Sequence, residues 1–352
     1  GPATARRSAQ CVIWKHERMT KIRSRDSRMI QDRRGQSGGG GGGGLLGGGR
    51  GGRGGGLGDV LGGALGGGRR GGGGGIKAGG GLIGVLLLVA TLFLPKLLGG
   101  ASGGAATLGA STAASSQTTG GDDETCSSEA EQILCGATID VQEYWQEQYP
   151  ESFNGLEYPI TQTVFFSGFT NTGCGQASSQ TGPFYCPADQ LIYFDLDFLA
   201  QLQTRFNAEG DLAAQYIVAH EYGHHVQNGL GINAEMFRRQ QADPRNANAY
   251  SIALELQADC LAGAWANDAN ARNQFDSRAE IQEALDAAAA VGDDAIQQAT
   301  QGRVSPESWT HGSSEQRVRW FNVGFQTGDP NRCDTFGELE RAIEAGGGSQ
   351  DI

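Results

Sequence analysis

The six-residue run HEYGHH, residues 220–225, constrains this chain more than any other feature, because it holds three of the five histidines in 352 residues. The flanking run DLAAQYIVAHEYGHHVQ, residues 211–227, favours a helix. On a helix, positions i and i+4 share a face, so His220 and His224 point the same way with Glu221 beside them. Gly223 costs such a helix ~1 kcal/mol relative to Ala, which predicts a close neighbour. H-E-x-x-H is the spacing of a zinc site with an adjacent base.

A hydrolytic zinc site has three protein ligands, so one more must come from elsewhere. The longer motif H-E-x-x-H-x-x-G-x-x-H is excluded, because Gln227 and Leu230 occupy its Gly and third His positions. Glu255 is the better candidate, and Asp259 lies one helical turn further along the same face, where it can accept a hydrogen bond from a ligand histidine. The spacing also allows Glu255 to be a solvated carboxylate. By composition, other acids could be the third ligand instead: Glu235, Asp243 and Asp268.

The remaining histidines near these motifs have different expected roles. His225 lies about 100° around the helix from His224, so it is predicted to be packed or hydrogen-bonded rather than a ligand. His311 precedes an S-x-x-Q capping box, which predicts a helix over residues 314–324. His311 would stabilise an oxyanion if its loop lay over the metal, and otherwise it is a histidine beside a helix cap.

Two arginines follow His311 in the sequence. Arg317 and Arg319 can bind a substrate carboxylate or pair with the many acids of this part of the chain. The second role is favoured.

Four stretches together resemble the putative neutral zinc metallopeptidase family of bacterial membrane-anchored proteins. They are GPFYCPADQLIYFDLDF, HEYGHHVQ, ELQADCLAGAWA and THGSSEQRVRWFNVGFQTGD, within residues 126–336. The resemblance implies His220, His224 and Glu255 as ligands of one zinc ion and Glu221 as catalytic acid and base.

The N-terminal part differs sharply in composition from the rest. Glycine is concentrated in residues 36–104, and such a tract cannot bury enough apolar surface to offset the entropy of ordering. Residues 78–95 carry no charge, which predicts a transmembrane helix over residues 78–98. The alternative is a cleaved signal peptide, with residues 101–103 as a weak cleavage site, but the long preceding segment argues against it.

Charge predicts the orientation of this span. Residues 1–77 contain fifteen basic and four acidic residues, a net of +11, and the remainder contains 12 basic and 35 acidic residues, a net of −23. The positive-inside rule puts the N-terminus in the cytoplasm and the acidic domain outside a bacterial cell membrane, crossed once. The negative charge also argues against nucleic acid as a partner.

Six cysteines lie in the predicted exported part, which suggests three disulfides. Fifteen pairings are possible. The short loops and the position of Glu255 favour Cys126–Cys135, Cys174–Cys186 and Cys260–Cys333.

Together these features predict a mainly helical α+β, zincin-like domain with a small sheet. The predicted organisation is a disordered basic arm (1–77), a span (78–98), a flexible stalk (99–123), the metallopeptidase domain (124–345) and a flexible tail (346–352). Strands are expected at 161–166 and 190–194, and helices at 137–147, 195–206 and 280–300. The expected function is zinc-dependent hydrolysis of peptide bonds in a protein or peptide. The alternatives are a non-proteolytic zinc-binding surface module and a zinc amidase acting on a cell-wall peptide.

Overall fold

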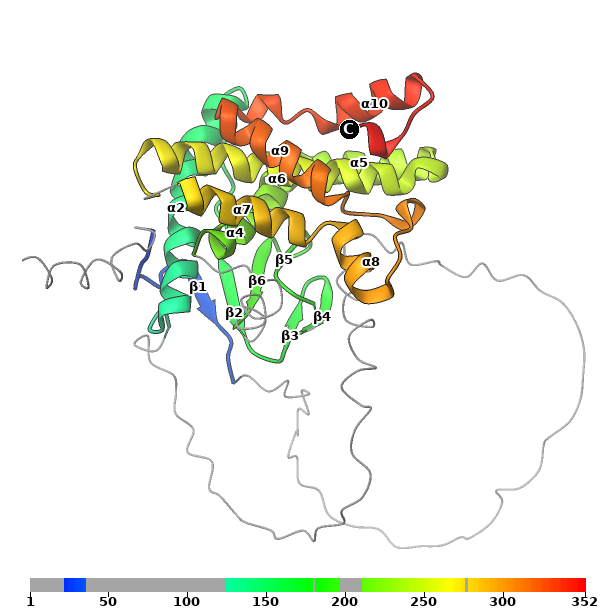
Figure 1. Ribbon diagram of the computed structural model, residues 1–352. Coiled ribbons are helices and arrows are strands. Elements are labelled where there is room, and N and C mark those ends of the chain that lie inside the picture. Colours follow the sequence, from blue (N-terminus) through cyan, green and yellow to red (C-terminus); the bar gives the residue numbers. More distant parts are fainter. Residues whose placement is uncertain (1–21, 36–124, 180, 197–210, 276–277) are drawn as a thin grey trace, which may run out of the picture.

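The computed structural model describes residues 22–35, 125–179, 181–196, 211–275 and 278–352. Within these ranges the fold is α+β and mainly helical with a small sheet, as predicted (Figure 1). Its strands are β1 (Ile30–Asp32), β2 (Thr163–Phe166), β3 (Phe169–Thr172), β4 (Gly175–Ser178), β5 (Phe184–Cys186) and β6 (Leu191–Asp195). Its helices are α2 (Glu129–Ser152), α4 (Asp211–Gly229), α5 (Ile232–Ala242), α6 (Ala247–Ala271), α7 (Arg278–Ala290), α8 (Asp293–Gln301), α9 (Ser314–Thr327) and α10 (Thr335–Glu344).

The main sheet has the order β1–β2–β6–β5, with β5 antiparallel to β6 and the other pairs parallel. β2 is buried along its whole length. Because successive side chains alternate between the two faces, Phe165 joins the main helical core, whereas Val164 and Phe166 join a smaller cluster with Ala177 of the β3–β4 hairpin. The sheet is therefore covered on both faces, by helices on one and by the hairpin on the other.

The helical layer is built around α6, which contacts α4 on one side and α9 on another. At the crossing of α4 and α6, a Cβ added at Gly223 would lie 3.0 Å from both Cα and O of Ala258. This is the close neighbour that the glycine in the HEYGHH run predicts. The small residue lets the two helices approach each other where both carry site residues.

All three expected disulfides are confirmed: Cys126–Cys135, Cys174–Cys186 and Cys260–Cys333. The first closes the start of α2, and the second ties β5 to the β3–β4 hairpin. The third joins α6 to the segment before α10, so the helix that carries Glu255 is covalently held to the C-terminal part of the domain.

The structure corrects the prediction of one long helix over residues 280–300, because α7 ends at Ala290 and α8 begins at Asp293. Helix propensity alone favours continuity through this alanine-rich run. The reason for the break is tertiary: a Cβ at Gly292 would lie 2.4 Å from the backbone nitrogen of Ser314. The helix is interrupted at Gly292, and the backbone at the start of α9 packs against this residue.

Two segments predicted to be flexible are packed instead. Residues 22–35, placed in the disordered arm by their basic composition, contribute β1 to the sheet. Residues 346–352 are not a free tail, since Ile352 is buried and its carbonyl accepts a 2.9 Å hydrogen bond from the side chain of Gln316. Neither segment has an apolar periodicity that a sequence pattern would reveal.

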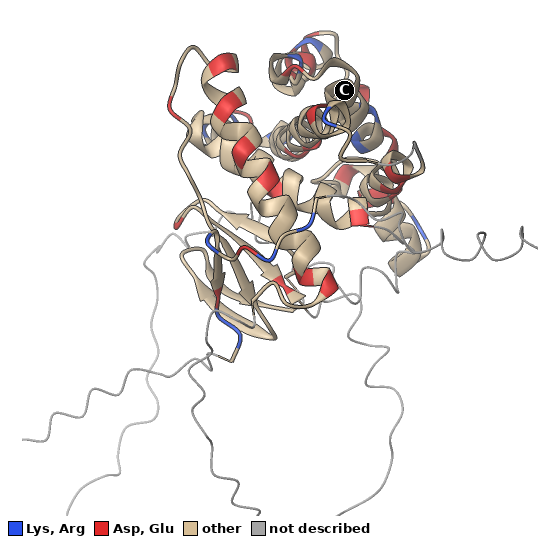
Figure 2. Ribbon diagram, turned by 90° about the vertical axis from the view of Figure 1, so that its left-hand side faces the viewer, with Lys and Arg blue, Asp and Glu red and all other residues tan. Residues whose placement is uncertain are grey.

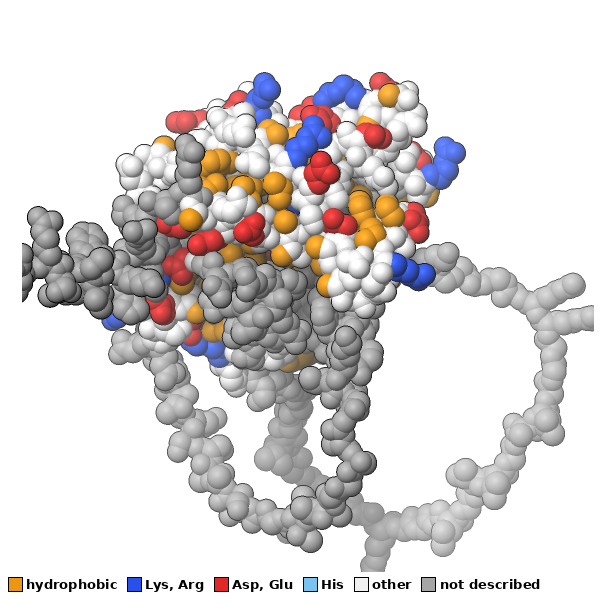
Figure 3. Space-filling model, viewed as in Figure 1, with side chains coloured by type: hydrophobic (Ala, Val, Ile, Leu, Met, Phe, Trp, Pro, Cys, Tyr) orange, Lys and Arg blue, Asp and Glu red, His pale blue; other side chains and the backbone are white. Residues whose placement is uncertain are grey.

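The predicted span 78–98, the stalk 99–123 and most of the predicted helix 195–206 lie outside the described residues. Among the residues that the structure describes, none of the helices combines the length and the apolar character that a membrane crossing requires. Acidic side chains recur along several helices (Figure 2) and are interspersed with basic and apolar ones on the face shown in Figure 3, in keeping with the net negative charge of this part of the chain.

Candidate metal centre

Three buried side chains from α4 and α6 converge on one point. Nε2 of His220 lies 3.3 Å from one carboxylate oxygen of Glu255, and Nε2 of His224 lies 3.6 Å from the other. One ligand atom from each residue falls within 4.8 Å of the others. Among the described residues, no other group of three or more His, Cys, Asp or Glu side chains is placed to hold one metal ion.

The donor set fits zinc. Tetrahedral zinc with N and O ligands at ~2.0–2.2 Å places neighbouring ligand atoms about 3.3–3.6 Å apart, and each imidazole nitrogen lies at such a distance from one of the two Glu255 oxygens. Two imidazoles and a carboxylate are the ligand types of hydrolytic zinc sites, which leave one position open. The alternative acids are engaged elsewhere: Glu235 pairs with Arg239, Asp268 with Arg272, and Asp243 bonds to Asn246.

The second nitrogen of each histidine has its own hydrogen-bond partner. Nδ1 of His220 lies 2.8 Å from Asp259, as the helical spacing predicts. Nδ1 of His224 lies 2.9 Å from the amide oxygen of Gln227, whose amide nitrogen donates to the backbone oxygen of Leu254 on α6. Because these acceptors fix the protonated nitrogen as Nδ1, both Nε2 atoms are free to bind a metal.

Asp259 is fully buried and is held by two further side chains. Arg317 on α9 donates to both of its oxygens, at 2.7 and 2.9 Å, and the hydroxyl of Tyr216 donates to one of them at 2.5 Å. Burial opposes ionisation of this carboxyl, but Arg317 and His220 lower its pKa to about 2. Arg317 thus pairs with an acid, as favoured above, and its partner is the carboxylate that bonds to Nδ1 of His220.

The charges at the centre are arranged for a cation. Burial opposes protonation of His220, yet Asp259 and Glu255 raise its pKa to about 9. Burial also opposes ionisation of Glu255, but His224 and His220 hold the pKa of that carboxyl well below its usual range. The centre thus combines two ionised carboxylates, Glu255 and Asp259, with the two imidazoles, a balance that favours a cation.

Glu221 lies beside His220 on α4 and contacts the sheet. Its carboxylate accepts a hydrogen bond from the backbone of Tyr185 on β5, and burial raises its pKa. The Tyr185 hydroxyl contacts His225 at 3.1 Å and accepts from Asn228 at 3.0 Å, so β5 is fastened to α4. His225 also contacts the backbone oxygen of Pro159. It is thus a packed, hydrogen-bonded histidine, as expected, and does not face the metal site.

His311 lies close enough to Glu255 to contribute to the lowered pKa of that carboxyl. Its Nδ1 lies 3.0 Å from Asp293, the first residue of α8, and the same carboxylate accepts from the backbone nitrogens of Thr310 and His311 at 2.7 Å each. The predicted capping box is present at the start of α9. The break between α7 and α8 therefore supplies the carboxylate that fixes the His311 loop.

The fold and the geometry above define a helical α+β protein with a candidate His-His-Glu metal centre. The chain belongs to the putative neutral zinc metallopeptidase family, whose model matches residues 57–336.

An uncharacterized protein of Mycobacterium tuberculosis is 54% identical over 181 residues, which cover 49% of this chain and 60% of that protein. An uncharacterized Escherichia coli K12 protein, YpfJ, is 43% identical over 211 residues, 60% of this chain and 72% of its own length. The match thus spans less than two thirds of the mycobacterial relative. No solved structure matches the chain significantly.

Proposed function

We propose that this chain is a zinc-dependent peptidase that hydrolyses peptide bonds in protein or peptide substrates, with His220, His224 and Glu255 as the zinc ligands. The observation that carries the proposal is the position of Glu221 beside this ligand set. A site that only stabilised the fold would have no use for a buried carboxylate next to its ligands. Zinc bound there supplies a Lewis acid for the scissile carbonyl and acidifies water.

Glu221 is the general base in this proposal. Its carboxylate takes a proton from the attacking water and then delivers that proton to the leaving amine. Burial raises its pKa, which suits a group that must both accept and donate a proton near neutral pH. Asp259 and Gln227 keep the two ligand histidines in the orientation that binds zinc.

The substrate is expected to bind beside β5. This strand is at the end of the sheet order, and its Tyr185 backbone bonds to Glu221. An extended peptide can add to such an edge by main-chain hydrogen bonds. That arrangement puts a peptide bond next to the proposed base.

The test of the function uses the purified full chain. We expect about one zinc per chain, cleavage of casein or a peptide library, loss of cleavage with a chelator and recovery on adding zinc. Zinc binding without cleavage of any protein or peptide would instead favour the non-proteolytic module. Cleavage restricted to cell-wall peptides would favour the amidase.

We expect His311→Ala to lower kcat/KM for a peptide substrate by about 10²-fold with zinc content unchanged, because one donor to the developing oxyanion is lost. Asp293→Asn should produce a smaller loss, since it loosens the loop but keeps the imidazole. Asp286→Asn, at an exposed site on α7, is the matched control. A His311→Ala enzyme within threefold of the wild type would limit His311 to a structural role.

A further inference from the structure

We propose that residues 22–35 are an integral part of the domain formed by residues 125–352, in which they add a strand to the sheet and hold the start of α4, and that they lie on the same side of any membrane as that domain. The family match begins only at residue 57 and does not include this segment. The proposal rests on three sets of contacts, to β2, to α2 and to α4. It is independent of the chemistry proposed for the metal centre.

The first contacts add β1 to the sheet beside β2. β1 pairs in parallel with β2 from Ile30–Thr163 to Asp32–Phe165. Flanking bonds extend the pairing, because Thr163 donates to Met29 at 2.9 Å and Arg33 donates to Phe165 at 2.8 Å. β2 is buried on both faces, a pattern typical of interior strands in parallel sheets rather than of edges. Without β1, its backbone groups on this side would lose these partners.

The second contacts explain a glycine in α2. Gly136 lies inside this helix, where glycine costs ~1 kcal/mol relative to Ala. A Cβ there would lie 2.6 Å from Cα of Arg23 and 2.7 Å from its backbone nitrogen. The backbone of Ser24 also donates to the carbonyl of Gln132 at 3.0 Å. The helix thus has a glycine at the point where the N-terminal segment crosses it.

The third contacts join the segment to α4, the helix that carries His220 and His224. Arg23 bridges Asp211, the first residue of α4, at 2.5 Å and Glu129 of α2 at 2.9 Å. One turn further along α4, the buried side chain of Gln215 donates to the carbonyl of Ile22 at 3.2 Å. The later turns of the same helix carry His220 and His224. The segment therefore ties the start of the ligand-bearing helix to α2.

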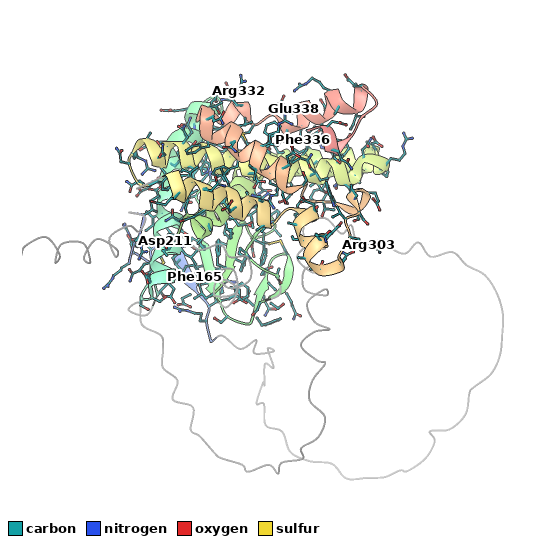
Figure 4. All side chains as sticks on the ribbon, viewed as in Figure 1. Phe165, Asp211, Arg303, Arg332, Phe336 and Glu338 are labelled. Atoms are coloured by element: carbon teal, nitrogen blue, oxygen red, sulfur yellow. A yellow bond between two sulfur atoms is a disulfide. The ribbon has the colours of Figure 1, made fainter. Side chains whose placement is uncertain are left out.

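Figure 4 shows where these contacts lie: Phe165 and Asp211 are on the side of the molecule that carries β1, and Arg303 is on the opposite side. The positive charges of residues 22–35 lie against acidic side chains of the domain. Arg23 meets Asp211 and Glu129, and Arg34 meets the buried Glu131 at 2.6 Å. Basic residues that indicate a cytoplasmic arm by composition are here partners of acids on the domain.

This docking bears on the orientation that the sequence predicts. A single membrane crossing by residues 78–98 would put residues 22–35 and residues 125–352 on opposite sides, and β1 would then be unable to pair with β2. The contacts therefore require both ends of the segment 36–124 to lie on one side.

The test is a cysteine cross-link in the full chain within intact cells. The side-chain ends of Gln31 and Gln162 meet at 2.6 Å, but Gln31 lies opposite Val164 in the strand pairing, two residues from Gln162, so a direct disulfide would not reach. Gln31→Cys with Gln162→Cys should therefore be joined by a short, membrane-permeant reagent with two methanethiosulfonate groups, which forms a disulfide to each cysteine. Cys11→Ser is included to remove the one cysteine outside the three disulfides of the described residues. A site for a specific protease, inserted in the glycine-rich tract, cuts the chain between the two cysteines. We expect the two fragments of most molecules to migrate together until a reductant is added.

The control variant replaces Gln162→Cys by Arg303→Cys, at an exposed position on the opposite side, and should not cross-link. Cross-linking of the Gln31 and Gln162 variant no higher than that control, in a protein whose native disulfides have formed, overturns the proposal. A cross-link that joins two chains also contradicts it, because β1 would then come from a second copy.

Discussion

Glu221→Gln is expected to lower kcat for peptide cleavage by roughly 10³-fold while leaving the zinc content unchanged. The size follows from the usual contribution of a positioned general base, ~10²–10⁴-fold. Gln has nearly the same shape and can still accept the hydrogen bond from Tyr185, so the packing of α4 on β5 should persist. What disappears is the carboxylate that takes the proton from water.

The measurement pairs zinc content with kcat on one peptide substrate for wild type, Glu221→Gln and Glu235→Gln. Glu235 is the matched control, because it lies on a neighbouring helix and pairs with surface arginines. It should leave kcat within about twofold. If Glu221→Gln keeps its zinc and cleaves within tenfold of the wild type, another group is the base and the assignment of Glu221 fails.

The parts of this site that follow from the sequence are the local ones. His220 and His224 share a face because they are four residues apart, and the same rule aligns Glu255 with Asp259 on α6. Such spacings depend only on helix geometry, so they do not require knowledge of the fold. The disulfides could also be predicted, since two of them close short loops.

The parts that could not be predicted depend on contacts between distant segments. Asp293 reaches His311 only because Gly292 lets the Ser314 backbone approach, and an alanine-rich run gives no sign of that break. β1 is a three-residue strand in a basic segment without alternation, and its pairing with β2 crosses more than a hundred residues of sequence. In both cases tertiary contacts override what local composition favours.

Arg317→Met is the second large effect that we expect: a loss of about 3 kcal/mol in the free energy of unfolding together with zinc affinity lowered about 10–100-fold. Asp259 is fully buried, and Arg317 supplies the bidentate pair that compensates its charge. Removing one member of a buried pair leaves the other charge uncompensated, which costs several kcal/mol.

The matched control is Arg319→Met, because Arg319 is on the same helix but its ion pair with Glu338 is solvent-exposed. An exposed pair contributes about 0–1 kcal/mol, so this variant should stay close to wild type. Guanidinium denaturation with the disulfides intact measures stability, and competition with a chelator measures zinc affinity. Equal stability and equal affinity for the two variants would exclude a special role for Arg317.

A double variant separates stability from positioning. In Arg317→Met with Asp259→Asn, no buried charge is left unpaired, so much of the lost stability should return. The amide oxygen can still accept from Nδ1 of His220, but a neutral acceptor does less to raise the basicity of that ligand. Zinc affinity should therefore stay low although the fold recovers. If affinity returned together with stability, Arg317 and Asp259 would be a buried pair that supports the fold alone, and orientation of His220 would not require the carboxylate.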